Sequence, residues 1–103
     1  MDIKNATEAF TALSQETRLK VFKILVEYGH TGTAAGTISK TLNMPHNSLS
    51  FHLTHLSQAG LITSQKKGRS IIYTANIQSI ENLIHYLKEN CCSKQNNAEG
   101  KCL

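Results

Sequence analysis

The residues with the clearest chemical potential in this sequence are three cysteines, Cys91, Cys92 and Cys102, all near the end of the 103-residue chain. An odd number of cysteines gathered at one end is a poor framework for structural disulfides. Three thiolates without an obvious fourth ligand suit a soft three-coordinate ion such as As(III), because structural zinc normally takes four ligands. The pattern therefore predicts a metalloid site formed by these three side chains.

Other interpretations of the cysteines stay open. The same thiols would suit Cd(II), Hg(II) or a redox sensor, or they are incidental thiols of the tail. A disulfide between the adjacent Cys91 and Cys92 would be strained. No pair of histidines lies beside the cysteines, so the histidines are not expected to be metal ligands. His52 and His55 of the fourth helix are expected to make packing or polar contacts. The histidines are His30, His46, His52, His55 and His85.

No combination of residues predicts catalysis. The sequence lacks a Gly-rich phosphate loop, a nucleophile beside a base, and a metal site with an open position and a general base. The Cys-x-x-Cys spacing of small thiol redox proteins is also missing. We therefore predict that the chain is not an enzyme.

Size and composition predict one compact domain. The chain is 40% hydrophobic and has a formal net charge of +4, which permits binding to nucleic acid without requiring it. No apolar run approaches the roughly 20 residues of a membrane span. The first residues lead directly into a helical pattern rather than a signal peptide, so we expect a cytoplasmic protein without a membrane partner.

Hydrophobic periodicity divides the chain into short elements. Ser14 is expected to cap the second helix, Gly29 to end it, and Pro45 to occupy the first position of the fourth. Residues 30–33 are expected to form a loop. Helices are expected over residues 6–13, 14–28, 34–42, 45–59 and 77–90, and strands over residues 61–65 and 70–74.

These elements predict a mainly α fold with a small β-hairpin, in the order α-α-α-α-β-β-α. The third and fourth helices form a helix-turn-helix, and the hairpin after them forms a wing, so the fold is a winged helix-turn-helix. Residues 1–90 are expected to be the DNA-binding and dimerisation domain. Residues 91–103 are expected to be a flexible tail that carries the cysteines.

The fourth helix is expected to read DNA bases. Leu49, Leu53 and Leu56 form its inner stripe, which leaves short polar groups outward near the helix N-terminus, where base edges are reached. Phe51 would contact a thymine methyl group or pack on a neighbouring element. The outward candidates for DNA binding are His46, Asn47, Ser48, Ser50, Phe51 and Thr54.

The tip of the hairpin, expected over residues 66–69, carries the cations Lys66, Lys67 and Arg69, which would contact phosphates or the minor groove. Two alternatives are a solvated turn that binds nothing and a winged helix that binds protein. The cations at the tip favour DNA over a protein partner.

Several stretches resemble the ArsR/SmtB family of metal-responsive repressors. Residues 12–22 (ALSQETRLKVF) resemble the start of the family's second helix. Residues 45–53 (PHNSLSFHL) and 58–62 (QAGLI) resemble its recognition helix and first wing strand, and residues 68–69 with Tyr73 fit its wing.

This resemblance covers about residues 6–90. It implies a homodimer built from the first and last helices, which represses an operon until an inducer binds. An apolar stripe on the last helix agrees, because a terminal helix of so small a domain needs a partner surface. The stripe consists of Ile80, Leu83, Ile84 and Leu87.

The resemblance also bears on the inducer. The family's Cys-x-Cys arsenic site falls at Ala34 and Gly36, and three positions of its zinc site fall at Ile77, Ser79 and Asn90, so neither site is expected here. The chain instead resembles an atypical arsenical-responsive subgroup, whose last helix ends in a Cys-Cys pair followed by a third cysteine.

Together these features predict a DNA-binding transcriptional repressor that As(III) releases from its operator, with Sb(III) as a further candidate inducer. The expected ligands are Cys91, Cys92 and Cys102, and the expected partners are double-stranded operator DNA and a second copy of the chain. The alternative is a repressor of the same fold that senses thiol oxidation, Cd(II) or Hg(II).

Overall fold

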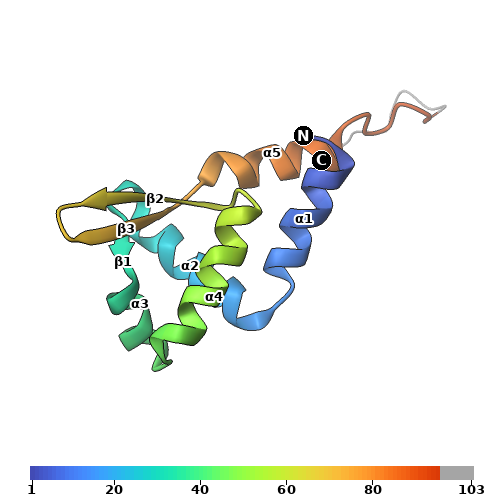
Figure 1. Cartoon of the computed structure of the whole chain (residues 1–103). Helices are drawn as coiled ribbons and strands as arrows, with labels where there is room; N and C mark the ends of the chain where they lie inside the picture. Colours follow the sequence, from blue (N-terminus) through green and yellow to red (C-terminus); the bar gives the residue numbers. More distant parts are fainter. Residues whose placement is uncertain (96–103) are drawn as a thin grey trace.

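The computed structural model describes residues 1–95 (Figure 1). The predicted order of four helices, a hairpin and a final helix is confirmed, and a short 3-10 helix and a short strand are added where a loop was expected. The elements are α1 (Ile3–Leu13), α2 (Glu16–Tyr28), η1 (Gly29–Thr31), β1 (Thr33–Ala34), α3 (Ala35–Leu42), α4 (His46–Gln58), β2 (Ile62–Lys67), β3 (Ser70–Ala75) and α5 (Ile77–Lys88).

Helix α4 occupies the middle of the molecule, with α1 on one side and α3 and the sheet on the other (Figure 1). Helix α5 begins beside the end of α4, where the backbone N–H of Asn76 donates to the Leu61 carbonyl oxygen at 2.8 Å. The β2–β3 hairpin projects away from α1 (Figure 1). The tip of the hairpin therefore lies away from α1 and from the end of α5 (Figure 1).

The first helix begins earlier than predicted because Asp2 caps it. The Asp2 carboxylate accepts a 2.8 Å hydrogen bond from the backbone N–H of Asn5. The prediction that Ser14 caps α2 is wrong, because Ser14 keeps helical dihedrals and its hydroxyl donates to the Thr11 carbonyl oxygen. The extended backbone of an N-cap falls at Gln15, whose side-chain oxygen accepts from the Arg18 N–H at 2.8 Å.

Strand β1 replaces part of the loop expected over residues 30–33. Thr33 pairs with Tyr73 and Ala34 with Ile72, so the sheet order is β1-β3-β2. Gly32 permits this approach, because its φ is +67° and a Cβ there would collide with the Tyr73 carbonyl oxygen. Two residues are too few to form a periodic pattern, so β1 could not be predicted from hydrophobic periodicity.

The turn between α3 and α4 is held by local polar contacts. Asn43 adopts the left-handed conformation at the end of α3, with φ +51°. The Ser39 hydroxyl donates to the Met44 carbonyl oxygen. Pro45 has an extended backbone, with ψ 147°, so it caps α4 instead of occupying its first turn as predicted.

The hairpin strands are longer and the tip is shorter than predicted. Lys66 and Lys67 lie within β2, and Lys67 pairs with Ser70. Only Gly68 and Arg69 remain in the turn, where the φ of +63° at Gly68 suits a two-residue hairpin. The paired region is longer than predicted because a two-residue turn fixes the register of the two strands. Pairing can then continue to Lys67 and Ser70 without an alternation of apolar and polar residues.

The core draws on every α-helix and on the sheet. Small residues on α1 allow close packing against α2 and α4. Helix α5 ends at Lys88, before the predicted residue 90, and within it Leu83 alone is buried. The buried apolar residues include Ala6, Ala9, Ala12, Val21, Leu25, Ile38, Leu49, Leu53, Leu56, Leu61 and Leu83.

Two sequence predictions concern the end of the chain. The division into a domain over residues 1–90 and a tail over residues 91–103 stays a prediction. Cys102 lies outside the described residues. Within residues 1–95, no helix combines the length and the apolar character needed to cross a membrane.

Candidate nucleic-acid interface

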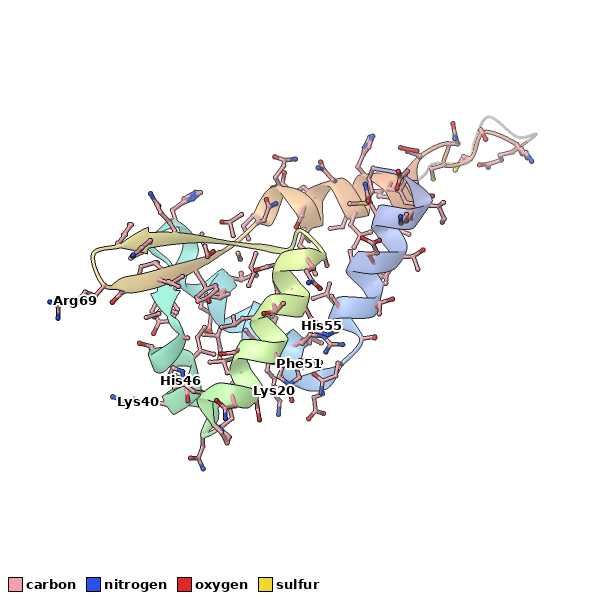
Figure 2. All side chains as sticks on the ribbon, viewed as in Figure 1. Lys20, Lys40, His46, Phe51, His55 and Arg69 are labelled. Atoms are coloured by element: carbon pink, nitrogen blue, oxygen red, sulfur yellow. The ribbon has the colours of Figure 1, made fainter. Side chains whose placement is uncertain are left out.

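The outer face of α4 is exposed along its whole length. Leu49, Leu53 and Leu56 are buried, which turns the opposite side of the helix to solvent. Every base-reading candidate predicted on this helix is exposed, and Figure 2 shows His46 at the end where α4 begins. The exposed candidates are His46, Asn47, Ser48, Ser50, Phe51 and Thr54.

Three of these residues point most directly away from the core. Successive helical residues turn by about 100°, so Phe51 lies about 200° from the buried Leu49. Asn47 and Thr54 lie four residues before and three residues after Phe51, which places all three on one stripe. The Thr54 hydroxyl donates to the Ser50 carbonyl oxygen at 2.9 Å, so its methyl group and oxygen lone pairs remain for other contacts.

Phe51 contacts two histidines of its own helix. Its ring centroid lies 4.6 Å from that of His55, tilted by 50°, and 5.9 Å from that of His52 in an edge-to-face arrangement. The side chain is still 60% exposed. Packing within α4 therefore orders the ring without burying it (Figure 2).

The wing presents its three cations to solvent. Lys66, Lys67 and Arg69 are exposed, and Figure 2 shows Arg69 at the far tip of the hairpin. The ion pair found within residues 1–95 joins Lys20 and Glu16 on α2 at 3.4 Å. The wing cations are thus not neutralised by a carboxylate of the described chain, and they are available to phosphates.

One cation near this face was missed by sequence reasoning. Lys40 is exposed on α3, one turn after Gly36. A Cβ at Gly36 would lie 3.9 Å from the Nε2 atom of His46, so this face of α3 adjoins the start of α4. The sequence shows that Lys40 follows Gly36 by one helical turn. It does not show that His46 lies beside Gly36, which is what brings this part of α3 next to α4.

Behind the outer face, His52 lies in a partly buried position. Its Nδ1 atom is buried without a hydrogen-bond partner within the described chain. Burial lowers the pKa of the His52 imidazole, and the positive charges of Arg18 and His55 lower it further. The lowered pKa favours the neutral imidazole, and the packing or polar role predicted for His52 stays a prediction.

The Cys91 and Cys92 side chains meet just after α5. Their Sγ atoms are 3.4 Å apart, and both residues are exposed. Because α5 ends at Lys88, the cysteines are freed from the helical geometry that would point them about 100° apart. Residues 1–95 hold no group of three or more metal-ligating side chains, and the third predicted ligand, Cys102, is outside that range.

Comparison with known proteins identifies relatives across most of the chain. A family model described as a helix-turn-helix domain matches residues 13–65. The arsenical resistance operon repressor of Bacillus subtilis (strain 168) is 28% identical over 100 residues, which cover 97% of this chain and 91% of that protein. The transcriptional repressor SdpR of the same organism is 33% identical over 78 residues, which cover 76% and 83%.

Solved structures share the fold. An ArsR-like transcriptional regulator from Rhodococcus sp. RHA1 matches with a TM-score of 0.78 and 26% identity, covering 88% of this chain and 83% of that one. The homodimeric winged helix-turn-helix DNA-binding domain of Mb0332 from Mycobacterium bovis matches with a TM-score of 0.68, covering 92% and 88%. At 17% identity, the second likeness shows the fold alone.

The helix-turn-helix, the cationic wing and the polar outer face of α4 define a winged helix-turn-helix DNA-binding protein. The chain belongs to the ArsR family of helix-turn-helix transcriptional regulators, and the relatives it resembles include two repressors. Its relatives are DNA-binding regulators and not enzymes, which confirms the prediction of a non-enzymatic role.

Proposed function

We propose that As(III) releases this repressor from its operator by binding to Cys91, Cys92 and Cys102, with Sb(III) as a second candidate inducer. The observation that carries the proposal is the 3.4 Å separation of the Cys91 and Cys92 Sγ atoms. The similarity to an arsenical resistance operon repressor over 97% of the chain supports the same class of inducer.

The sulfur geometry suits one shared soft ion. Metal–thiolate bonds of about 2.3 Å, at angles between 90° and tetrahedral, place two sulfurs on one ion roughly 3.3–3.8 Å apart. The Cys91–Cys92 separation falls in this range. The third thiolate in this proposal comes from Cys102, because As(III) takes three soft ligands and the sequence holds no other cysteine.

DNA binding is assigned to two surfaces with different tasks. The exposed Lys66, Lys67 and Arg69 of the wing contact phosphates, which carry affinity but no sequence information. The exposed polar side chains of α4, among them Asn47 and Ser50, contact base edges in the major groove.

The operator-bound form is a homodimer joined through α1 and α5. Both helices expose large apolar side chains: Ile3 is 68% exposed, Ile84 52% and Leu87 61%. An apolar surface of this kind marks a partner surface in so small a domain. The homodimeric Mb0332 domain has the same fold.

The proposed inducer site lies away from the DNA-reading surfaces, so release is allosteric. The cysteines follow α5, and the end of α5 lies beside the start of α1 (Figure 1). Capture of the tail by As(III) changes the end of α5 and, through the dimer surface, the spacing of the two α4 helices. A typical coupling of about 1–3 kcal/mol weakens DNA binding roughly 5- to 150-fold.

The test is operator binding with and without As(III), measured by fluorescence anisotropy on a duplex from the upstream region of its own gene. Wild-type protein and a Ser93→Ala control should lose affinity when As(III) is added. A Cys91→Ser/Cys92→Ser double variant should bind the duplex normally and ignore As(III). Cys102→Ser should respond partially, because two thiolates and one added thiol still hold As(III).

Three results separate the proposal from its alternatives. X-ray absorption at the arsenic edge should count three sulfur ligands in the wild-type complex. Release of the double variant by As(III) would refute the cysteine site. Release of the wild type by peroxide, Cd(II) or Hg(II), without a response to As(III), would establish the redox or heavy-metal alternative.

A further inference from the structure

We propose that Phe51 reads the C5 methyl group of a thymine in the major groove and thereby sets part of the operator sequence. This inference rests on the base-reading role proposed for α4 and not on the identity of the inducer. Phe51 has no hydrogen-bonding group, so it can distinguish bases only through apolar contact.

The position of Phe51 is that of a DNA-contacting residue. It lies on the side of α4 opposite Leu49, in the first half of the helix, where base edges are reached. Asn47 lies one turn earlier on the same stripe. Four residues advance a helix by about 6 Å, or roughly two base-pair steps, so both side chains can contact neighbouring bases of one site.

The structure gives no internal reason for an aromatic residue at this position. Phe51 is 60% exposed and does not belong to the hydrophobic core. Within α4, which the structure describes in full, it is the one large apolar side chain that is exposed. An exposed phenyl ring on an otherwise polar face indicates an apolar contact with a partner.

The ring is also held in place before DNA arrives. Contacts with His55 at 4.6 Å and His52 at 5.9 Å restrict its rotation. A side chain that is already ordered loses less conformational entropy on binding. Of the groups that base pairs show in the major groove, the thymine methyl is the apolar one, so it is the group that this ring can recognise.

The experiment begins with duplexes selected by the wild-type protein from a random-sequence pool. Each thymine of the selected site is then replaced by deoxyuridine, which keeps the base pair and removes only the methyl group. One thymine in each half-site should be sensitive to this replacement. There the wild type should bind about fourfold more weakly for each methyl removed, which corresponds to about 0.8 kcal/mol. Phe51→Ala should bind the two duplexes equally well.

Two controls assign the effect to Phe51. Thr54→Ser removes another methyl from the same stripe and should keep the discrimination at the thymine read by Phe51. Lys67→Ala should weaken binding to both duplexes by the same factor. Circular dichroism should show unchanged folding for Phe51→Ala, because the ring lies outside the core.

The possible failures are distinct. Equal binding of thymine and deoxyuridine duplexes by the wild type, or discrimination that persists in Phe51→Ala, would overturn the role of Phe51 and leave DNA binding intact. A pool without any enriched sequence would contradict base reading by α4, and this inference with it. Neither result depends on the response to As(III).

Discussion

Arg18 joins α2 to the end of α1, because its Nε atom donates a 2.8 Å hydrogen bond to the carbonyl oxygen of Ala12. Its Nη2 atom reaches the Thr11 carbonyl oxygen at 3.5 Å, and the residue is only 9% exposed. The guanidinium therefore caps the negative end of the α1 dipole. It also links a helix of the proposed dimer surface to the helix that packs on α4.

Removing this link should destabilise the fold. Arg18→Ala should lower the free energy of unfolding by about 2–3 kcal/mol, because charge-assisted hydrogen bonds are lost and the Ala12 carbonyl loses a partner. Lys20→Ala is the control: it breaks only the exposed pair with Glu16, and the change should stay within about 0.5 kcal/mol. Urea unfolding at one fixed protein concentration measures both, and equal effects would contradict the role of Arg18.

Stability should decrease in mildly acidic solution because of His52. Its pKa in the folded state lies below the ordinary value of 6.5, so below pH 6.5 the unfolded chain takes up a proton that the folded chain resists. The free energy of unfolding is therefore unaffected by His52 above pH 6.5. It decreases as the pH falls from 6.5 through the lower pKa of the folded state. Urea unfolding between pH 7.5 and about 5 should show a shallower loss for His52→Gln than for the wild type. A His85→Gln control, changed at an exposed position, should follow the wild type.

The wing and α4 should respond differently to substitution. Lys67→Ala should weaken binding to specific and random duplexes alike and reduce the salt slope by about one unit. Asn47→Ala should cost roughly 1–3 kcal/mol on the specific duplex only, and relax the preference at one base position. Lys88→Ala changes the end of α5, far from the tip of the wing, and should change neither (Figure 1). Equal losses on both duplexes for Asn47→Ala would contradict its role.

The exposed apolar residues of α5 should control dimerisation. Leu87→Ser removes a side chain that is 61% exposed in one protomer, and it should raise the dimer dissociation constant. Sedimentation analysis at micromolar concentration should show more monomer, with a matching loss of operator affinity. Ile71→Ser changes a 49% exposed residue of the wing and should leave the dimer intact. A wild-type protein that is monomeric at these concentrations would refute the proposed dimer.

Gly32 should tolerate substitution less well than another glycine of similar φ. Gly32→Ala combines an unfavourable positive φ with collisions against β3, and should destabilise the chain by about 2–4 kcal/mol. Gly68→Ala shares the positive φ, but a Cβ there meets nothing within 4 Å. The difference between the two, measured by thermal unfolding, isolates the contact between β1 and β3. Equal effects would show that backbone conformation alone decides.

The sequence by itself determined the order of the five α-helices and the hairpin, and the outer face of α4. Both follow from local periodicity: Leu49, Leu53 and Leu56 repeat at helical spacing, which fixes their burial and the exposure of Asn47 and Phe51 without knowledge of other segments. The cysteine pair is likewise a property of the sequence, although its role as an inducer site stays a proposal.

Only the tertiary structure decided the features that join distant segments. Strand β1 exists because Gly32 lets the chain reach Tyr73, and the Arg18 cap exists because α2 folds back against the end of α1. The contact of the Phe51 ring with His55, which leaves the side chain 60% exposed, also came from the structure, and the thymine contact stays a proposal. Such contacts depend on how the elements assemble, and no pattern within one element encodes them.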